Sequence, residues 1–264
     1  MIQVIRNLFV LVVAASIPIY ASAETTLRLA YSDVESYPFQ MGNGTEVSTP
    51  PGLALDVINA VAEELDLRVQ YIRVPGKRVL QDIETGSVDG GFIFSYNTQR
   101  AQYANYPMHD QQPDRSKRIA TIGYYFYVLQ GQPLSWNGEN LVGSNKKVGA
   151  HLGFSIVREL KNKNFNVYEV KTTEQLFNML RRQRVSAIAV QDTMAQKFLG
   201  SQSGNHIKKL HPPITTKDYY LVLSHPFVEN NPELANKIWQ RIRDVREDIY
   251  STHTEKYLVE SLPK

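Results

Sequence analysis

Apolar and polar positions alternate along this chain with two different periods, which predict strands and helices in succession. Residues 26–31 and 67–74 alternate at every second position, as half-buried strands do. Between them, residues 52–65 carry apolar side chains three and four positions apart, the spacing of an amphipathic helix. A short helix at 78–85 and an apolar strand at 92–94 follow. This part of the chain predicts the order strand–helix–strand–helix–strand, which is typical of a mostly parallel sheet.

The same order is predicted a second time further along the chain. The second set comprises strands at 147–150, 166–170 and 185–190 and helices at 153–160 and 173–182. An aromatic strand at 121–129 precedes this set, and a strand at 219–223 and a long helix at 232–250 follow it. We therefore expect two α/β units with the same architecture, although no residue-level repeat relates them.

The N-terminal segment has a different character from the rest of the chain. Arg6 precedes an almost entirely apolar stretch at 8–17, and Ala21-Ser22-Ala23 then supplies small residues for cleavage. This is the three-part pattern of a secretory signal peptide, with cleavage before Glu24. The alternative, a membrane anchor, would need about 20 apolar residues to span a bilayer. We expect residues 1–23 to be removed and the mature protein to be periplasmic.

Composition narrows the possible functions. The chain has 264 residues, long enough for two compact lobes, and it contains no cysteine. It therefore has no disulfide, no thiol nucleophile and no thiolate metal site. Its net charge of +3 is too small to favour nucleic acid or an anionic membrane as partner. Histidines other than His151 show no ligand spacing, so we predict no metal and no other cofactor.

Residues 86–100 combine a predicted strand with polar and cationic side chains at its end. Ser95, Tyr96 and Arg100 follow the apolar run, and in open α/β sheets ligands bind beyond the carboxyl ends of the strands. A guanidinium group binds a planar carboxylate through two parallel hydrogen bonds, so Arg100 suits a small anionic ligand. The alternative is a solvated arginine early in a helix, since arginine is usually exposed.

Five short motifs occur in a characteristic order behind the signal peptide. They are Pro-Gly-Leu-Ala-Leu-Asp at 51–56, a leucine–glycine–aspartate element at 80–89, the polar loop 95–100 with Tyr106-Pro107, the glycine-containing 147–153, and 185–192. Together they resemble the type 2 periplasmic solute-binding proteins of family 3, the substrate-binding proteins of polar amino-acid ABC transporters. Asn97 stands where that family usually has threonine, which indicates a divergent branch.

The resemblance implies a fold and a domain organisation. The fold class is α/β, with two lobes that each contain a mixed sheet flanked by helices. Residues 24–124 plus 218–264 would form lobe one, and residues 125–217 would form lobe two. Two hinge crossings near Tyr124 and Tyr219 would join the lobes and allow them to close on a ligand.

The resemblance also implies a set of ligand-binding residues. They are Asp33, Ser95, Arg100, His151, Phe154, Ser155 and Asp192. Arg100 would bind an α-carboxylate with help from the Ser95 hydroxyl, and Asp192 would hold an α-ammonium group from the other lobe. Aspartate after a strand is also a common helix cap, so a purely structural role for Asp192 stays open. Whether Lys77 or Arg78 reaches the cleft also stays open.

The function implied is capture of a small polar solute, an amino acid in the first instance, for delivery to a membrane permease. A ligand-sensing module for a membrane receptor would need the same closing cleft and is the alternative. A dehydratase-like enzyme on this fold would have a glutamate three residues after Asp192, where this chain has Ala195. We therefore expect a non-enzymatic, monomeric binding protein without catalytic residues.

Overall fold

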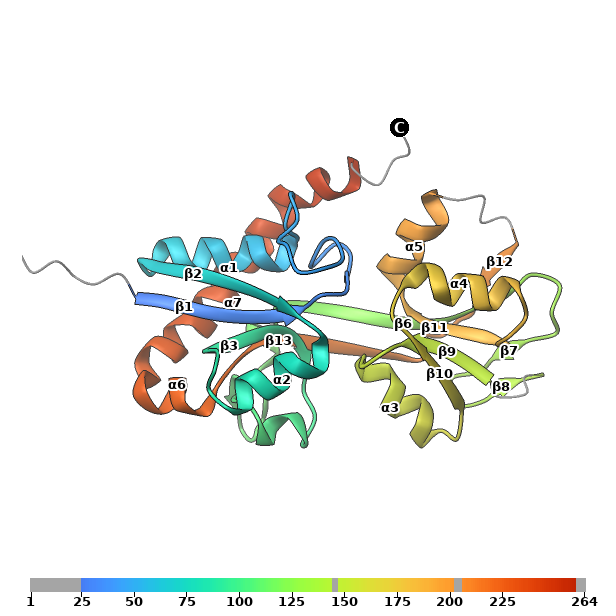
Figure 1. The fold of residues 1–264 in the computed structure, drawn as a ribbon, viewed down its shortest axis with the longest axis horizontal. Coiled ribbons are helices and arrows are strands. Elements are labelled where there is room, and N and C mark those ends of the chain that lie inside the picture. Colours follow the sequence, from blue (N-terminus) through green and yellow to red (C-terminus); the bar gives the residue numbers. More distant parts are fainter. Residues whose placement is uncertain (1–24, 144–146, 202–205, 260–264) are drawn as a thin grey trace, which may run out of the picture.

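The computed structural model describes residues 25–143, 147–201 and 206–259 (Figure 1). The predicted signal peptide lies outside these ranges. Within them, no helix combines the length and apolar character needed to cross a membrane. The mixed α/β architecture predicted from the sequence is confirmed.

The described residues form one main sheet of nine strands, in the order β10-β9-β11-β6-β13-β3-β1-β2, with β12 paired to β6. The strands are β1 (Thr25–Ser32), β2 (Leu67–Val74), β3 (Gly90–Ser95), β6 (Ala120–Leu129), β9 (Lys147–His151), β10 (Asn166–Val170), β11 (Ala187–Gln191), β12 (Ile207–Lys209) and β13 (Thr215–Leu223). Strands β1, β2 and β3 are parallel, as are β9, β10 and β11, whereas β6 and β13 run antiparallel to their neighbours.

Helices flank this sheet at both ends (Figure 1). They are α1 (Leu53–Glu64), α2 (Gly76–Glu84), α3 (Ser155–Asn162), α4 (Thr173–Arg181), α5 (Asp192–Ser201), α6 (His225–Asn230) and α7 (Pro232–Val259). Short 3-10 turns η1 (Arg100–Gln102) and η2 (Arg115–Lys117) and the small hairpins β4 (Met108–His109) with β5 (Gln112–Pro113) and β7 (Ser135–Trp136) with β8 (Leu141–Val142) complete the set. Helices α5 and α6 and strand β12 were not expected from the sequence pattern.

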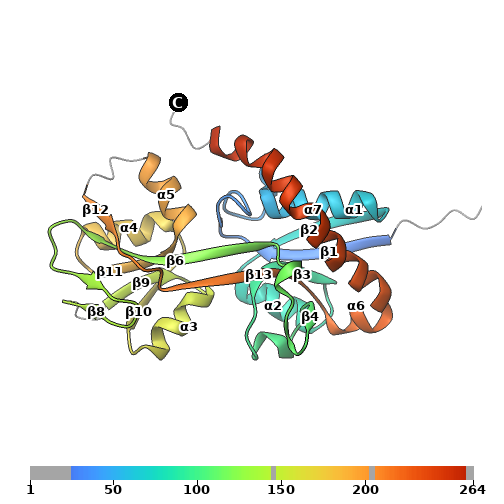
Figure 2. The ribbon, with the colours of Figure 1, turned by 180° about the vertical axis from the view of Figure 1, so that it is seen from behind.

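Strands β6 and β13 run side by side between two groups of elements, which form the two lobes (Figures 1 and 2). At one tyrosine in each strand, the neighbouring strand changes. Tyr124 lies opposite both Thr215 of β13 and Gln191 of β11, and Tyr219 lies opposite both Ala120 of β6 and Ser95 of β3. The predicted hinge positions coincide with these changes of partner. Bending at those residues, and the lobe boundaries, stay predictions.

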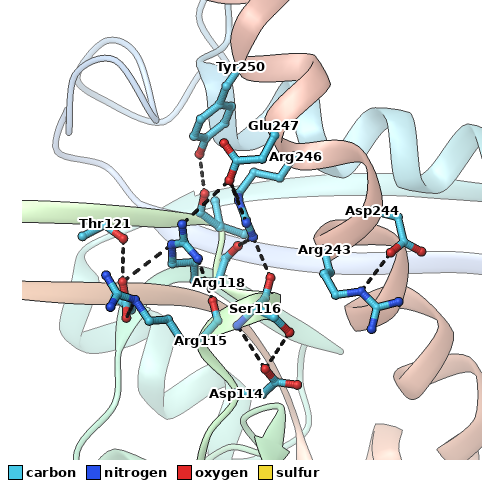
Figure 3. Close-up of polar contacts among 12 residues, drawn as sticks. Asp114, Arg115, Ser116, Arg118, Thr121, Arg243, Asp244, Arg246, Glu247 and Tyr250 are labelled. Atoms are coloured by element: carbon cyan, nitrogen blue, oxygen red, sulfur yellow. Dashed lines mark hydrogen bonds and ion pairs between the residues drawn. The ribbon is translucent and has the colours of Figure 1, made fainter.

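Helix α7 fixes the first-lobe ends of both crossing strands (Figure 3). The guanidinium of Arg246 is buried, at 5% exposure, and donates to the carbonyl oxygens of Ser116 at 2.8 Å and Arg118 at 2.5 Å, just before β6 begins. Tyr250 donates to the carbonyl oxygen of Ile119. Asp218 of β13 pairs with Arg118 at 3.7 Å. The base of the crossing strands is thereby attached to the first lobe.

The end of α7 also completes the core against α1. Tyr257 is fully buried, and its hydroxyl donates to Asp56 at 2.7 Å and accepts the backbone N–H of Gly52 at 3.0 Å. Tyr37 donates to the carbonyl oxygen of Tyr257 at 3.1 Å. Residues near the end of the chain therefore hold the start of α1.

Strand β3 lies between β1 and β13, and glycines make that close approach possible. A Cβ atom at Gly91 would stand 2.7 Å from the carbonyl oxygen of Ala30 and 2.9 Å from Ile83. The register against β13 shifts between Tyr220 and Val222, and Ile93 adopts a left-handed φ of 61°. This bulge bends the strand just before it delivers its polar end to the site.

Candidate functional site

Two adjoining cavities form a cleft between the lobes. The outer one measures about 720 Å³ and the inner one about 80 Å³. They share six lining residues, namely Lys77, Leu80, Arg100, Gly153, Phe154 and Ser155. The first three come from α2 and η1, and the other three from the turn after β9 and the first residue of α3. The outer volume falls within the usual range of small-molecule sites.

Arg100 lies at the junction of the two cavities and is held by its own loop. Its Nη1 donates to the carbonyl oxygen of Ser95 at 3.1 Å and to the Ser95 hydroxyl at 3.0 Å. The guanidinium lies over Phe94, 5.5 Å from the ring centroid. Asn97 accepts the backbone N–H of Arg100 at 2.9 Å. Within the described ranges, Nε and Nη2 have no hydrogen-bond partner, so they remain free for a ligand.

A chain of hydroxyl and amide groups lies at the base of the inner cavity. Ser36 donates to Gln191 Oε1 at 2.6 Å, and Gln191 Nε2 donates to the Tyr124 hydroxyl at 3.0 Å. The Tyr219 hydroxyl also donates to Tyr124, at 3.2 Å, and contacts Ser155 Oγ at 3.1 Å. Burial raises the pKa of both tyrosines, so both stay protonated. Tyr124 accepts two hydrogen bonds and lines the inner cavity, so its hydroxyl faces a ligand bound there.

The second-lobe wall of the cleft is a turn supported by His151. Phe154 lines both cavities and stacks on the His151 ring, 4.7 Å between centroids. His151 is 1% exposed, and its Nε2 lies 3.1 Å from Thr173 Oγ1. Burial lowers the pKa of His151 to about 3, so its ring is neutral at ordinary pH. His151 lines neither cavity and acts as support for Phe154.

The structure brings together four of the seven predicted binding residues. Ser95, Arg100, Phe154 and Ser155 line the cleft. His151 lies behind it, and neither Asp33 nor Asp192 lines either cavity.

Asp33 and Asp192 have partners elsewhere. Asp33 pairs with Lys171 at 3.1 Å. Asp192 pairs with Lys209 at 2.7 Å and accepts the Tyr127 hydroxyl at 2.7 Å. Their roles in ligand binding stay predictions that the cavity lining does not support.

Several residues that line the inner cavity were missing from the predicted set, and four of them carry groups that a ligand could contact. They are Lys77, Tyr124, Gln191 and Tyr219. Gln191 ends strand β11 one position before Asp192, and the two tyrosines lie where the crossing strands change partner. Lys77 lines both cavities, whereas the Arg78 side chain is 69% exposed and pairs with Asp82 at 3.7 Å. The question left open by the sequence is thus decided for Lys77.

Charged contacts also join the two lobes across the cleft. Lys197 of α5 contacts both carboxylate oxygens of Glu35 at 2.9 Å. Arg158 of α3 donates to Gln99 at 3.3 Å. Together with the pair between Lys171 and Asp33, these contacts hold the cleft in a closed arrangement.

Comparison with protein-family models gives a match over nearly the whole described chain. The model for bacterial extracellular solute-binding proteins, family 3, matches residues 29–260. Comparison with curated protein sequences gives no match.

Solved structures with the same fold include several binding proteins. The GluR0 ligand-binding core from Nostoc punctiforme in complex with L-glutamate has a TM-score of 0.68 at 17% identity, covering 88% of this chain and 98% of that one. An ancestral arginine-binding protein bound to glutamine has a TM-score of 0.67 at 18% identity, covering 89% and 98%. An ancestral amino-acid-binding precursor of cyclohexadienyl dehydratase has a TM-score of 0.64 at 18% identity, covering 88% and 95%. At these identities the likeness establishes a two-lobed type 2 fold.

Proposed function

Because the chain belongs to the bacterial extracellular solute-binding proteins of family 3, we propose that it captures a small carboxylate-bearing solute in its interlobe cleft, for delivery to a membrane permease. The observation that carries this proposal is the position of Arg100. Its guanidinium lines both cavities, is oriented by Ser95 and keeps two nitrogens free for a planar acid.

Closure of the lobes would complete the site. Ligand contacts from Arg100 on one side and from Ser155 and Phe154 on the other would add to the ion pairs that already cross the cleft. A ligand that touches both lobes shifts a hinge equilibrium towards the closed state, because it binds that state better. Amino acids are one candidate class of carboxylate, since the structural neighbours include complexes with glutamate and glutamine.

Location and activity complete the proposal. With the predicted signal peptide removed, the mature protein would act in the periplasm, where a permease would receive the ligand. We propose no catalytic role, because Ala195 is a fully buried apolar residue at the position where a dehydratase would carry its acid.

A thermal-shift screen of the mature protein against amino acids, small carboxylates and polyamines tests the proposal. A ligand at a thousand times its dissociation constant should stabilise the protein by about 4 kcal/mol, which raises Tm by about 8–16 °C. In the variant Arg100→Ala, affinity for the ligand found should fall by about 2–5 kcal/mol. The matched control Arg78→Ala removes the same charge from an exposed side chain and should bind normally. Normal binding by Arg100→Ala would contradict the proposed site.

A further inference from the structure

The inner cavity carries positive charge that no acidic residue balances. Its charged lining residues are Lys77 and Arg100, and no aspartate or glutamate lines it within residues 25–143, 147–201 and 206–259. Neither cation makes an ion pair with another described residue. Lys77 does interact electrostatically, at longer range, with the Glu169 carboxylate.

The acids of the outer cavity are already neutralised by neighbouring cations. Glu159 pairs with Lys217, and Glu169 pairs with Lys161 at 2.8 Å. The third, Asp218, pairs with Arg115 at 3.1 Å and with Arg118 at 3.7 Å. Lys77, Arg100 and Arg158 remain without an ion-pair partner in the part of the chain described, so the cleft as a whole favours negative charge.

No carboxylate that could pair with an α-ammonium group lines the inner cavity in the part of the chain that the structure describes. Asp33 and Asp192 each pair with a lysine outside it. The strand end that approaches the ligand offers Gln191, an amide whose oxygen and nitrogen are both engaged, by Ser36 and Tyr124. An ammonium group shut into this cavity would lose its water without gaining a carboxylate, which is costly.

The charged groups that line the inner cavity are instead all hydrogen-bond donors. Arg100 offers Nε and Nη2, and Lys77 offers an ammonium group. Carboxylates accept hydrogen bonds and donate none, and charge-assisted bonds of this kind are about twice as strong as neutral ones.

We therefore propose that the cleft selects a small organic anion without an ammonium group, such as a dicarboxylate or a 2-oxo acid, over the corresponding α-amino acid. This inference rests on the proposed binding function and narrows its ligand class. The carboxylate would lie against Arg100 and Tyr124, and Lys77 would face a second acidic or carbonyl oxygen.

Calorimetric titration of the mature protein with matched pairs tests the inference. L-Aspartate with succinate, and L-glutamate with 2-oxoglutarate, differ at the α-carbon in whether an ammonium group is present. We expect at least one of the two deaminated acids to bind about tenfold more tightly than its amino-acid partner, and neither to bind more weakly. Tighter binding of the amino acids would overturn the inference and leave the proposed function standing. If none of the four acids binds at millimolar concentration, both the inference and the proposed function are wrong.

Two variants separate the role of Gln191 from that of Asp192. Gln191→Glu places a carboxylate of nearly the same shape in the inner cavity, and should shift the ratio of affinities towards the amino acid by about tenfold. Asp192→Asn removes a carboxylate outside the cavity and should leave that ratio unchanged. If Asp192→Asn instead weakens amino-acid binding selectively, Asp192 reaches the ligand and the inference is wrong.

Discussion

A single buried histidine, His151, should make the stability of the folded protein fall at low pH. His151 is 1% exposed, its Nδ1 has no hydrogen-bond partner among the described residues, and burial lowers its pKa to about 3. In the unfolded chain the same ring titrates near its ordinary value. Between these two values the unfolded state binds more protons than the folded state, so stability falls as the pH drops.

We expect this effect to reach about 2 kcal/mol at pH 5, counted from pH 7.5. Urea unfolding at the two pH values should show the loss in the wild-type protein and a loss smaller by that amount in His151→Gln. The control His206→Gln replaces an exposed histidine and should follow the wild type. An identical pH response in His151→Gln would mean that the ring is not buried in its neutral form.

A one-residue difference decides which polar side chain reaches the cleft at the end of β11. The sequence pattern ends the apolar run at Val190 and directs attention to Asp192. The strand continues to Gln191, whose side chain lines the inner cavity, and Asp192 starts α5 on another face. Successive strand residues point to opposite sides, and a single sequence does not fix which side faces the ligand. Arg100 was predictable as a cleft residue because a loop motif, rather than a strand register, places it, and Ser95 ends β3 at the start of the same motif.

At the scale of elements, β3 depends on the absence of side chains at its start. Gly91 lies against the carbonyl oxygen of Ala30 and the side chain of Ile83. Neither neighbour can move easily, because one is the backbone of β1 and the other is a side chain of the packed helix α2. Any Cβ there must push β3 away from β1, and the polar end of β3 moves with it.

Gly91→Ala should destabilise the protein by about 1–3 kcal/mol through overpacking, and should weaken ligand binding because Ser95 and Arg100 shift. Chemical denaturation and calorimetric titration measure the two effects. Gly200→Ala is the matched control, because Gly200 lies in α5 with no atom within 4 Å of an added Cβ. That change should stabilise α5 by about 0.5–1 kcal/mol. Equal effects of the two substitutions would contradict the close approach at β3.

Helices and strands with clear start and stop residues were predicted correctly from the sequence, and those without such residues were missed. Strand β2 and helix α1 match the expected ranges almost to the residue, because clear periodicity and flanking glycine or polar residues define them. Helix α5 was missed because it begins directly after β11, with no turn residue between strand and helix. Strand β12 has three residues, too few for any period to show.

At the scale of the whole molecule, charged groups far apart in the sequence hold the lobes together. Lys197 and Glu35 are only partly exposed, at 31% and 18% of their side-chain surfaces, and the pair bridges the cleft. Partly exposed ion pairs contribute modestly, about 0.2–1 kcal/mol each, and salt screens them. Because these pairs join the two sides of the cleft, we expect their contribution to act on the opening equilibrium.

Lys197→Glu should open the cleft, since it replaces this attraction with repulsion. We expect a larger radius of gyration by X-ray scattering and about fivefold weaker ligand binding. The double variant Glu35→Lys with Lys197→Glu restores an opposite-charge pair and should recover both properties. A double variant as open as the single one would show that the pair does not govern closure.

The contact between Tyr257 and the start of α1 joins segments that are about 200 residues apart, so we expect it to form late in folding. The first lobe takes β13, α6 and α7 from the C-terminal part of the chain, whereas β9, β10, β11 and their helices come from one continuous stretch. As the chain is synthesised, the second lobe has all these partners before the first lobe is complete. Until α7 is made, the apolar face of α1 has no partner helix, and Asp56 lacks the hydrogen bond that the Tyr257 hydroxyl donates. We therefore expect the cleft to be complete only after β13 and α7 have been synthesised, because the lobe that carries Arg100 is built on both.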